Sequence, residues 1–200
     1  MNELFDFNQN LILEDEFVRL RPLQATDFDN LLDISLSEPT LWKYSLVPAN
    51  GVENLKNYID IALKSREAKT EFPFIVFDKT KNKYAGSTRF YDINFPFKTL
   101  QLGYTFYGSE FQGTKVNKHC KYLLLKFAFE QFGMERVEFR ADNNNSKSIA
   151  AMKSIGCKVD GILRSNMPTY QSDARRDSIV LSILKSEWFE TVKANLELKL

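Results

Sequence analysis

The sequence predicts a mixed α/β domain whose central twisted sheet, of about six or seven strands, carries helices on both faces. Side chains alternate along residues 102–107, as in a strand, and apolar residues then recur at helical spacing from Val116 to Ala128. The elements follow one another as β, αα, βββ, α, β, α, ββ, α, which favours a mixed sheet. The helix–strand–helix unit between Gly113 and Ile155 suggests parallel pairing of its two flanking strands. All 200 residues are expected to form one domain.

The first half of the chain predicts short strands, two helices and two longer strands. A helix is expected to start at Thr26-Asp27, where polar residues precede an apolar stripe, and Asn50-Gly51 precedes a second one. The other predicted elements are two short strands within 10–23, a helix end at 38–40, an aromatic loop at 42–48, strands at 72–77 and 84–93, and a charged turn at 78–83 between them.

The second half predicts a long helix, a short helix and the remaining strands. Asn145 opens the short helix, and Gly156 ends it. The other predicted elements are a link at 94–97, a strand ending near Tyr107, a helix at 116–132, strands at 136–141, 158–163 and 178–184, a polar loop joining the last two, and a final helix from Ser186-Glu187.

Composition excludes several classes of function. The formal net charge of +1 gives no overall field for nucleic acid or an anionic membrane, and the charges of both signs are mixed along the chain. No apolar segment has membrane-spanning length, and the N-terminus does not read as a secretory signal. Cys120 and Cys157 belong to no paired motif, so we expect buried free thiols in a reducing, cytoplasmic setting.

The turn between the strand at 102–107 and the long helix is the first functional signal. Residues 108–117 are mostly polar and include Gly108 and Gly113. Such a turn places the free N–H groups of a helix start beside a strand end, and these donors, with the helix dipole, attract phosphate. Taken alone, the turn is also typical of any strand-to-helix connection. With the rest of the chain, it indicates a site for a phosphate-bearing cofactor.

Motifs spread along nearly the whole chain point to a known family. Each motif alone is weak evidence for a family, but the order and spacing of all of them together are fairly specific. They lie at 18–23, 86–90, 102–105, 111–114, 116–117, 145, 148, 155–156, 161–164, 176–177 and 187–188. In these residues the chain resembles the GNAT acyl-CoA N-acyltransferases, and within them the branch of the ribosomal-protein N-terminal acetyltransferases RimJ and RimL.

The resemblance implies acetyl-CoA as cofactor, direct acetyl transfer to an amine, and no need for a metal. It implies that acetyl-CoA lies where the strand ending at Tyr107 splays from the strand at 137–141. The pantetheine would pair with strand residues, Asn145 would bind its arm, and Ser148 would lie near the thioester sulfur. A backbone N–H on the splayed strand would stabilise the oxyanion. The implied cofactor-binding residues are Thr105, Phe106, Tyr107, Gln112, Gly113, Thr114, Lys115, Val116, Asn117, Lys118, Asn145 and Ser148.

Some positions depart from the family pattern. Lys115 stands where the phosphate loop has glycine, so it either crowds the loop or swings outward and adds a charge contact; Asn117 also departs from the pattern. Gln101 replaces a common glutamate, which leaves Asp92, Glu110 or water as the base. Because Met152 replaces a common tyrosine, Ser148 is the candidate catalytic acid.

Each candidate also has a simpler interpretation. Asn145 is a natural helix N-cap, Ser148 a surface serine, and His119 a surface or packing residue. Lys118 and Lys121 are expected on a solvated face, although Lys118 could reach a phosphate. Arg89, in mid-strand, needs a carboxylate partner from substrate or protein. The candidate acceptor residues, which could equally be core residues, are Trp42, Tyr44, Arg89, Tyr91 and Tyr104, with Phe90 more typical of core.

Three functions remain open on these residues. The first is an acetyl-CoA-dependent N-acetyltransferase acting on a protein N-terminus or a small-molecule amine. The second is an acyl-CoA-binding module without turnover, which Gln101 and Lys115 motivate. The third and weakest is another enzyme with a phosphate-bearing ligand. The sequence leaves monomer or homodimer open.

Overall fold

A single mixed sheet organises the computed structural model, which describes residues 5–169 and 172–200. Within those residues the sheet has eight strands in the order β1-β2-β3-β4-β5-β6-β8-β7. The predicted fold class is confirmed. The strands are β1 (Leu13–Glu14), β2 (Val18–Pro22), β3 (Phe72–Asp78), β4 (Lys83–Asn94), β5 (Thr99–Tyr107), β6 (Arg136–Asp142), β7 (Lys158–Thr169) and β8 (Ser172–Leu184).

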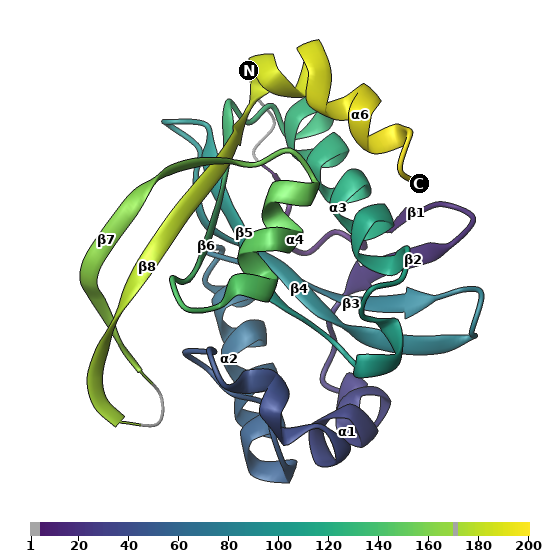
Figure 1. The fold of residues 1–200 in the computed structure, drawn as a ribbon. Helices are drawn as coiled ribbons and strands as arrows, with labels where there is room; N and C mark the ends of the chain where they lie inside the picture. Colours follow the sequence, from purple (N-terminus) through teal and green to yellow (C-terminus); the bar gives the residue numbers. More distant parts are fainter. Residues whose placement is uncertain (1–4, 170–171) are drawn as a thin grey trace.

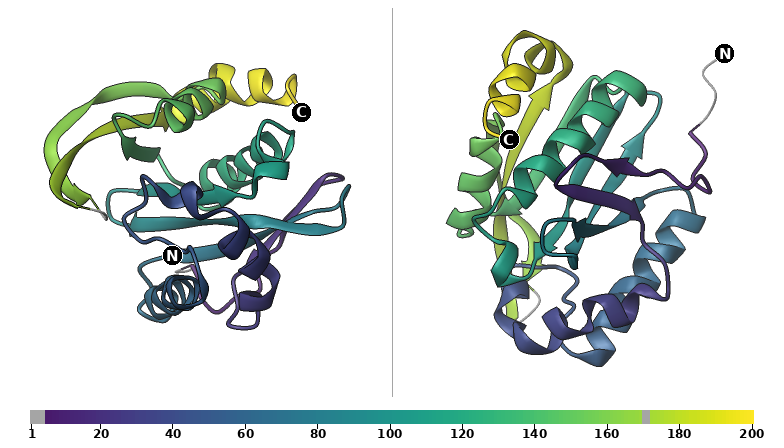
Figure 2. Two further views of the ribbon diagram at one scale, coloured as in Figure 1. Left: turned by 60° about the horizontal axis from the view of Figure 1, so that its bottom comes forward. Right: turned by 90° about the vertical axis from the view of Figure 1, so that its right-hand side faces the viewer.

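Helices cover both faces of this sheet (Figure 2). On one face lie α1 (Asp27–Ser37) and α2 (Val52–Glu67), joined by a segment that begins with a 3₁₀ turn at Pro39–Trp42. On the other lie α3 (Val116–Lys126), α4 (Ser146–Ser154) and the C-terminal α5 (Lys185–Glu187) and α6 (Lys193–Glu197). Short π-helical turns extend α3 over Phe127–Gln131 and link α5 to α6 over Trp188–Val192.

Each face has its own apolar core. Under α1 and α2, Leu31, Tyr58 and Ile59 pack with Phe106 of β5. The larger core under α3, α4 and α6 holds most of the buried phenylalanines, which cluster around Phe72, Phe90 and Phe127, several of them edge to face. The phenylalanine-rich composition therefore fills the core.

The final hairpin differs from the prediction. The sequence predicts a polar loop between short strands, but β7 and β8 instead form a long antiparallel hairpin that curves away from the body (Figure 1). Its register shifts between Leu163 and Met167, next to Ser165, which has a positive φ of 49°. Polar side chains suggest a loop, yet a solvated two-stranded ribbon accepts them on both faces.

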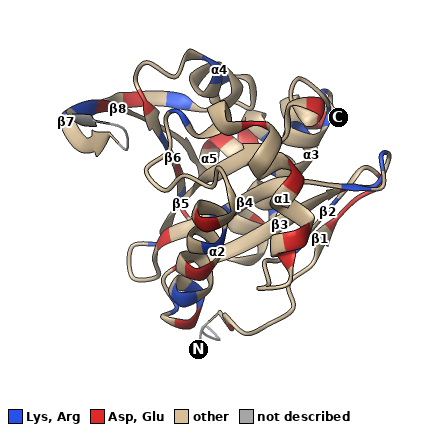
Figure 3. Ribbon diagram, turned by 90° about the horizontal axis from the view of Figure 1, so that it is seen from below, with Lys and Arg blue, Asp and Glu red and all other residues tan. Residues whose placement is uncertain are grey.

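The described charged residues of α1 and α2 do not form a basic face. In Figure 3, acidic and basic residues alternate along α2, whereas α1 carries acidic residues alone. No helix among the described residues is long and apolar enough to cross a membrane.

Candidate functional site

The site begins where β5 and β6 part. These strands pair in parallel over three positions only, from Thr99 opposite Arg136 to Gln101 opposite Glu138. Beyond them β5 has no strand partner on its β6 side, so residues 102–107 present an unpaired backbone edge. An extended, amide-rich ligand can add to such an edge as a strand would.

A bulge distorts β5 at the narrow end of this opening. The β4–β5 register shifts between Ser87 and Arg89, and Tyr104 has a φ of 50°. The Tyr58 hydroxyl donates to the Tyr104 carbonyl at 3.1 Å, which fixes the bulged peptide from the α2 side. A bulge turns backbone N–H and C=O groups, which would otherwise form hydrogen bonds to the neighbouring strand, in another direction.

The start of α3 supplies a group of free amide donors. Val116 N donates to the Thr114 hydroxyl at 3.3 Å. Across the described chain, no protein acceptor takes a hydrogen bond from the amides of the residues around it. These residues are Gly113, Thr114, Lys115, Asn117 and Lys118. Successive N–H groups at a helix start form an anion site, and a diphosphate satisfies several of them at once.

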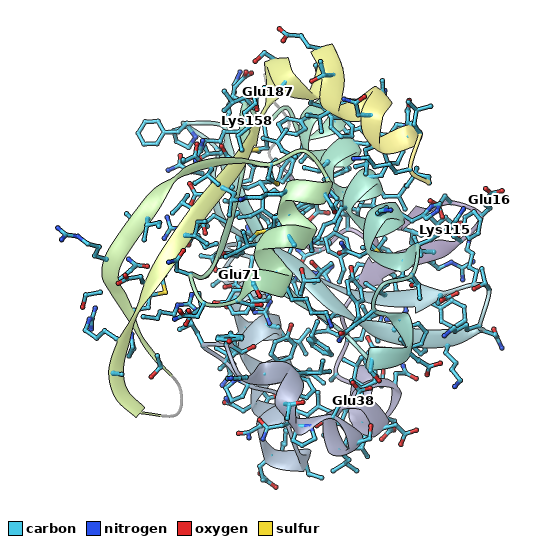
Figure 4. The ribbon with its side chains drawn as sticks, viewed as in Figure 1. Glu16, Glu38, Glu71, Lys115, Lys158 and Glu187 are labelled. Carbon is cyan, nitrogen blue, oxygen red and sulfur yellow. The ribbon has the colours of Figure 1, made fainter. Side chains whose placement is uncertain are left out.

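The loop takes its special conformation at Gly113 rather than at Lys115. Gly113 has a φ of 74°, while Lys115 is ordinary αR backbone at −68°. The Lys115 side chain swings outward: its Nζ lies over the Phe17 ring at 4.9 Å and donates to the Leu200 carbonyl. In Figure 4 it lies beside β1 and β2. Of the two expected outcomes, crowding is therefore not observed, and the outward lysine contacts protein.

The mouth of the opening is spanned from α4 to the loop. Lys147 Nζ donates to the Gln112 side-chain oxygen, and Gln112 Nε2 donates to the Tyr107 carbonyl at 2.7 Å. Gln112 thus ties the end of β5 to the first turn of α4. The side chains of Phe106 and Tyr107 are buried, so these two residues offer a ligand backbone only.

Asn145 and Ser148 lie at the start of α4. Asn145 Oδ1 accepts the Ser148 backbone N–H at 3.1 Å, so Asn145 is the N-cap. The side-chain nitrogen of Asn145, Nδ2, takes part in no hydrogen bond within residues 5–169 and 172–200. Ser148 is half-buried, and the described chain gives its hydroxyl no partner either.

Lys121 contradicts the sequence prediction. The sequence places it on a solvated face, but it is 5% exposed and its Nζ donates to the Thr105 hydroxyl at 2.9 Å. Thr105 in turn shares a hydrogen bond with Thr88 at 2.7 Å. The prediction failed because Lys121 lies beside the apolar stripe through Cys120 and Leu124, and its spacing of four residues from the buried Leu125 would have placed it within the buried face.

The candidate acceptor residues of the sheet do meet. Arg89 is fully buried, and its guanidinium stacks on the Tyr104 ring at 4.1 Å. Its carboxylate partner is the protein's own Glu71, whose Oε2 accepts from Arg89 Nη1 at 2.7 Å. Tyr91 packs edge to face on Tyr104 at 5.1 Å. Burial raises the pKa of both tyrosines.

The two candidate acceptor residues in the loop at 42–48 lie in different surroundings. Trp42 is 3% exposed and packs on Phe106 at 5.2 Å, which is a core position. Tyr44 is half-buried, and its carbonyl accepts from Arg176 Nη1 at 3.0 Å. Arg176 comes from β8, so the loop at 42–48 and the β7–β8 hairpin meet at this contact.

The candidate bases are already engaged. Gln101 Nε2 donates to Asp92 at 2.8 Å, and Glu110 pairs with Lys81 and Lys83 at 3.3 Å on an exposed surface. Glu71, which the sequence did not single out, contributes with Asp92 to raising the pKa of Tyr104, after burial. His119 stacks on Phe17 and contacts Asp15 at 2.7 Å, in the packing role expected of it.

A splayed strand pair, a bulge and an amide-lined helix start thus lie close together along β5 and the start of α3. The family model for an acetyltransferase (GNAT) domain matches residues 18–158. The chain belongs to the GNAT acetyltransferase family. Membership supports acyl-CoA-dependent acetyl transfer as the general activity of this GNAT domain. No curated protein matches the chain.

Solved structures agree with the assignment to GNAT. A T. thermophilus protein assigned as an acetyltransferase is 30% identical, with a TM-score of 0.85 over 94% of this chain and 96% of that one. A GCN5-related N-acetyltransferase from Brucella melitensis is 24% identical, with a TM-score of 0.87 over 96% and 86%. Mycobacterium smegmatis RimJ, in complex with CoA-disulfide, is 16% identical, with a TM-score of 0.78 over 95% and 93%.

Proposed function

We propose that this chain is an acetyl-CoA-dependent N-acetyltransferase that transfers acetyl to a primary amine. The acceptor is either a protein N-terminus or a small molecule. The observation that carries the proposal is the set of unpartnered amides between Gly113 and Lys118 in the described chain, next to the unpaired edge of β5. A diphosphate needs the first feature, and an amide-bearing pantetheine arm needs the second.

In this proposal, different residues bind different parts of acetyl-CoA. The amides of 113–118 hold phosphate, with Lys118 beside them. The backbone of Thr105, Phe106 and Tyr107 pairs with the arm, and Asn145 donates its free amide to it. Bound acetyl-CoA supplies an activated acetyl group, and Ser148 hydrogen-bonds the departing sulfur.

The acceptor lies on the other side of β5, near Tyr91, Tyr104 and Arg89. The carboxylates that interact with Tyr104 are Glu71 and Asp92, and each already accepts a hydrogen bond, from Arg89 and Gln101. A carboxylate held by a buried arginine is a weak base. We therefore propose that water, rather than Glu71 or Asp92, accepts the proton of the attacking amine.

Thiol release from acetyl-CoA, measured with a panel of amines, tests the proposal. The panel contains short peptides with free N-termini and small primary amines, and each reaction has an acceptor-free blank. We expect thiol release that depends on one acceptor class and a matching mass gain on that acceptor. Calorimetric binding of acetyl-CoA with no release on any amine contradicts the proposal.

That contrary outcome would favour an acyl-CoA-binding module without turnover. One observation supports this second candidate: Gln101 replaces the family glutamate, and the carboxylate beside it, Asp92, already accepts a hydrogen bond from Gln101. We further propose one domain over residues 1–200 and, since Cys120 and Cys157 are buried free thiols, a reducing cytoplasmic setting. The choice between monomer and homodimer is a matter for solution measurement.

A further inference from the structure

A buried ammonium without an acidic partner among the described residues lies between β5 and β6. Lys121 is 5% exposed, and its Nζ donates one hydrogen bond, to the Thr105 hydroxyl. The described residues offer it no carboxylate within ion-pair distance. An ammonium has three donors, so two have no protein acceptor in the part of the chain that the structure describes. A buried cation of this kind is costly unless a ligand uses it.

Its position is between the two splayed strands. Thr105 belongs to β5 beyond Gln101, the last residue that pairs with β6. Lys121 Nζ also lies 5.9 Å from the centre of the Phe139 ring, on β6. The amide-lined loop marks the wide end of the opening, and Thr105 lies farther from it along β5 than Tyr107. A ligand anchored by phosphate at the loop therefore directs its far end toward Lys121.

The neighbours of Lys121 leave its proton available. The titratable groups that act on it are Cys120, on its own helix, and Cys157, between α4 and β7. Burial raises the pKa of both thiols to about 12, so both stay neutral. Its neighbours on the sheet are Thr105 of β5 and Phe139 of β6, and Thr105 is hydrogen-bonded to Thr88 of β4. None of these residues is acidic. Burial lowers the pKa of Lys121 to about 8.

We propose that Lys121 is a catalytic residue that gives a proton to the sulfur leaving in acetyl transfer; this inference rests on the proposed function. The acceptor nitrogen forms the new C–N bond as the C–S bond breaks and leaves its electron pair on sulfur. Lys121 Nζ transfers one proton to that sulfur, which gives the thiol of coenzyme A and a neutral lysine. The acceptor nitrogen loses its surplus proton to water, and water restores the proton of Lys121.

A lysine suits this role better than the serine on α4. An ammonium whose pKa lies near the working pH gives up a proton far more readily than a hydroxyl does. Ser148 then orients the sulfur by a hydrogen bond, and Lys121 supplies the net proton. The positive charge also stabilises the thiolate before the proton arrives.

The test compares Lys121→Met with Lys126→Met, a matched change on the half-exposed side of the same helix. The first readout needs no acceptor. Free coenzyme A and its desulfo analogue are titrated into each protein by calorimetry from about pH 6 to about pH 9, and thiolate absorbance follows the bound thiol. Cys120 and Cys157 do not add to the thiolate absorbance in this pH range because burial raises their pKa values to about 12.

We expect wild type and Lys126→Met to lower the pKa of the bound thiol by about one unit, equal to about tenfold tighter binding of the thiolate. Lys121→Met should lose that shift and bind both ligands alike. With an active acceptor, Lys121→Met should lower kcat about 100-fold or more with little change in KM for acetyl-CoA. It should also lose the fall in kcat that wild type shows as Lys121 deprotonates at rising pH.

Two results separate the possible failures. If coenzyme A binds but Lys121→Met leaves the thiol pKa and the pH profile unchanged, this inference is overturned and the proposed function stands. If wild type does not bind coenzyme A, both are overturned. Thr105→Val is the second variant: it removes the acceptor of the ammonium while keeping the charge, so it should move the pH profile to lower pH rather than abolish it.

Discussion

Asn145 accepts the backbone N–H of Ser148 through its side-chain oxygen, at 3.1 Å, and so begins α4. This contact fixes the orientation of the side chain. Because the oxygen is used for the cap, the amide nitrogen points elsewhere and remains a donor. The simple interpretation of Asn145 as an N-cap and its functional interpretation as a ligand for the pantetheine arm are therefore compatible.

Asn145→Ser separates these two roles. Serine keeps an N-cap oxygen, so the helix should stay as stable, while the donor to the arm is lost. We expect acetyl-CoA affinity to fall by about 1–3 kcal/mol, measured by calorimetry. Asn145→Ala should lose the same affinity and also about 1 kcal/mol of folding stability in a denaturant titration. Unchanged affinity in both variants would show that the arm does not use Asn145.

Gly113→Ala and Lys115→Gly form a matched pair in the phosphate loop. An alanine at Gly113 meets open space, yet a φ of 74° strains it by about 1–2 kcal/mol. The amides should then turn away from phosphate, and acetyl-CoA affinity should drop. Lys115→Gly should change affinity by no more than about twofold, because its ammonium is held at the exposed surface by Phe17 and Leu200. A tighter-binding Lys115→Gly would mean that the lysine crowds the loop.

Glu71→Gln should destabilise the fold through Arg89. Arg89 is fully buried, and Glu71 is its carboxylate partner at 2.7 Å. Removing the negative charge leaves a buried guanidinium uncompensated, and we expect a loss of about 3 kcal/mol in the free energy of unfolding. Glu67→Gln, an exposed change on α2, serves as control and should unfold at the wild-type denaturant midpoint. Equal midpoints for both variants would show that the stacked tyrosines alone stabilise Arg89.

The sequence was a sound guide where one pattern repeated over many residues. The strand at 102–107 follows from a period of two, and the helix after it follows from a period of three to four. The turn between them follows from its glycine and its place in the chain, and its binding of phosphate stays a prediction. Gly113 was the informative glycine because its left-handed φ shapes the loop. The departure at Lys115 leaves the backbone of the loop unstrained because that position needs no special conformation; its effect on cofactor binding stays a prediction.

Sequence reasoning failed where a single side chain met a distant segment. The helical spacing of Lys121 from Leu125 places it on the buried face, but its partners Thr105 and Phe139 lie 16 or more residues away and no local pattern reveals them. Glu71 gains its role from Arg89, across the β3–β4 hairpin. The β7–β8 ribbon resembles a loop in the sequence because its polar residues carry no period, although backbone pairing and cross-strand hydrogen bonds of those polar side chains hold it together.

Lys121→Met should stabilise the protein, and the gain should depend on pH. Burial lowers the pKa of Lys121 from 10.5 to about 8, so between these values the unfolded chain binds more protons than the folded one. Stability of wild type therefore rises with pH across that window, and below about pH 8 the full cost of the buried charge is present. The difference of pKa values corresponds to about 3 kcal/mol.

Methionine removes the charge but keeps the length of the side chain. At neutral pH the variant should resist denaturant better than wild type, and this advantage should shrink as pH rises above the pKa of Lys121. Urea titrations of both proteins at several pH values measure the difference, and groups that titrate alike in both cancel. A pH-independent gap would mean that Lys121 has the same pKa in the folded and the unfolded chain, so that burial does not lower it. A protein that keeps a destabilising buried charge beside its cleft gains from it elsewhere, and proton transfer to sulfur is the gain that this position offers.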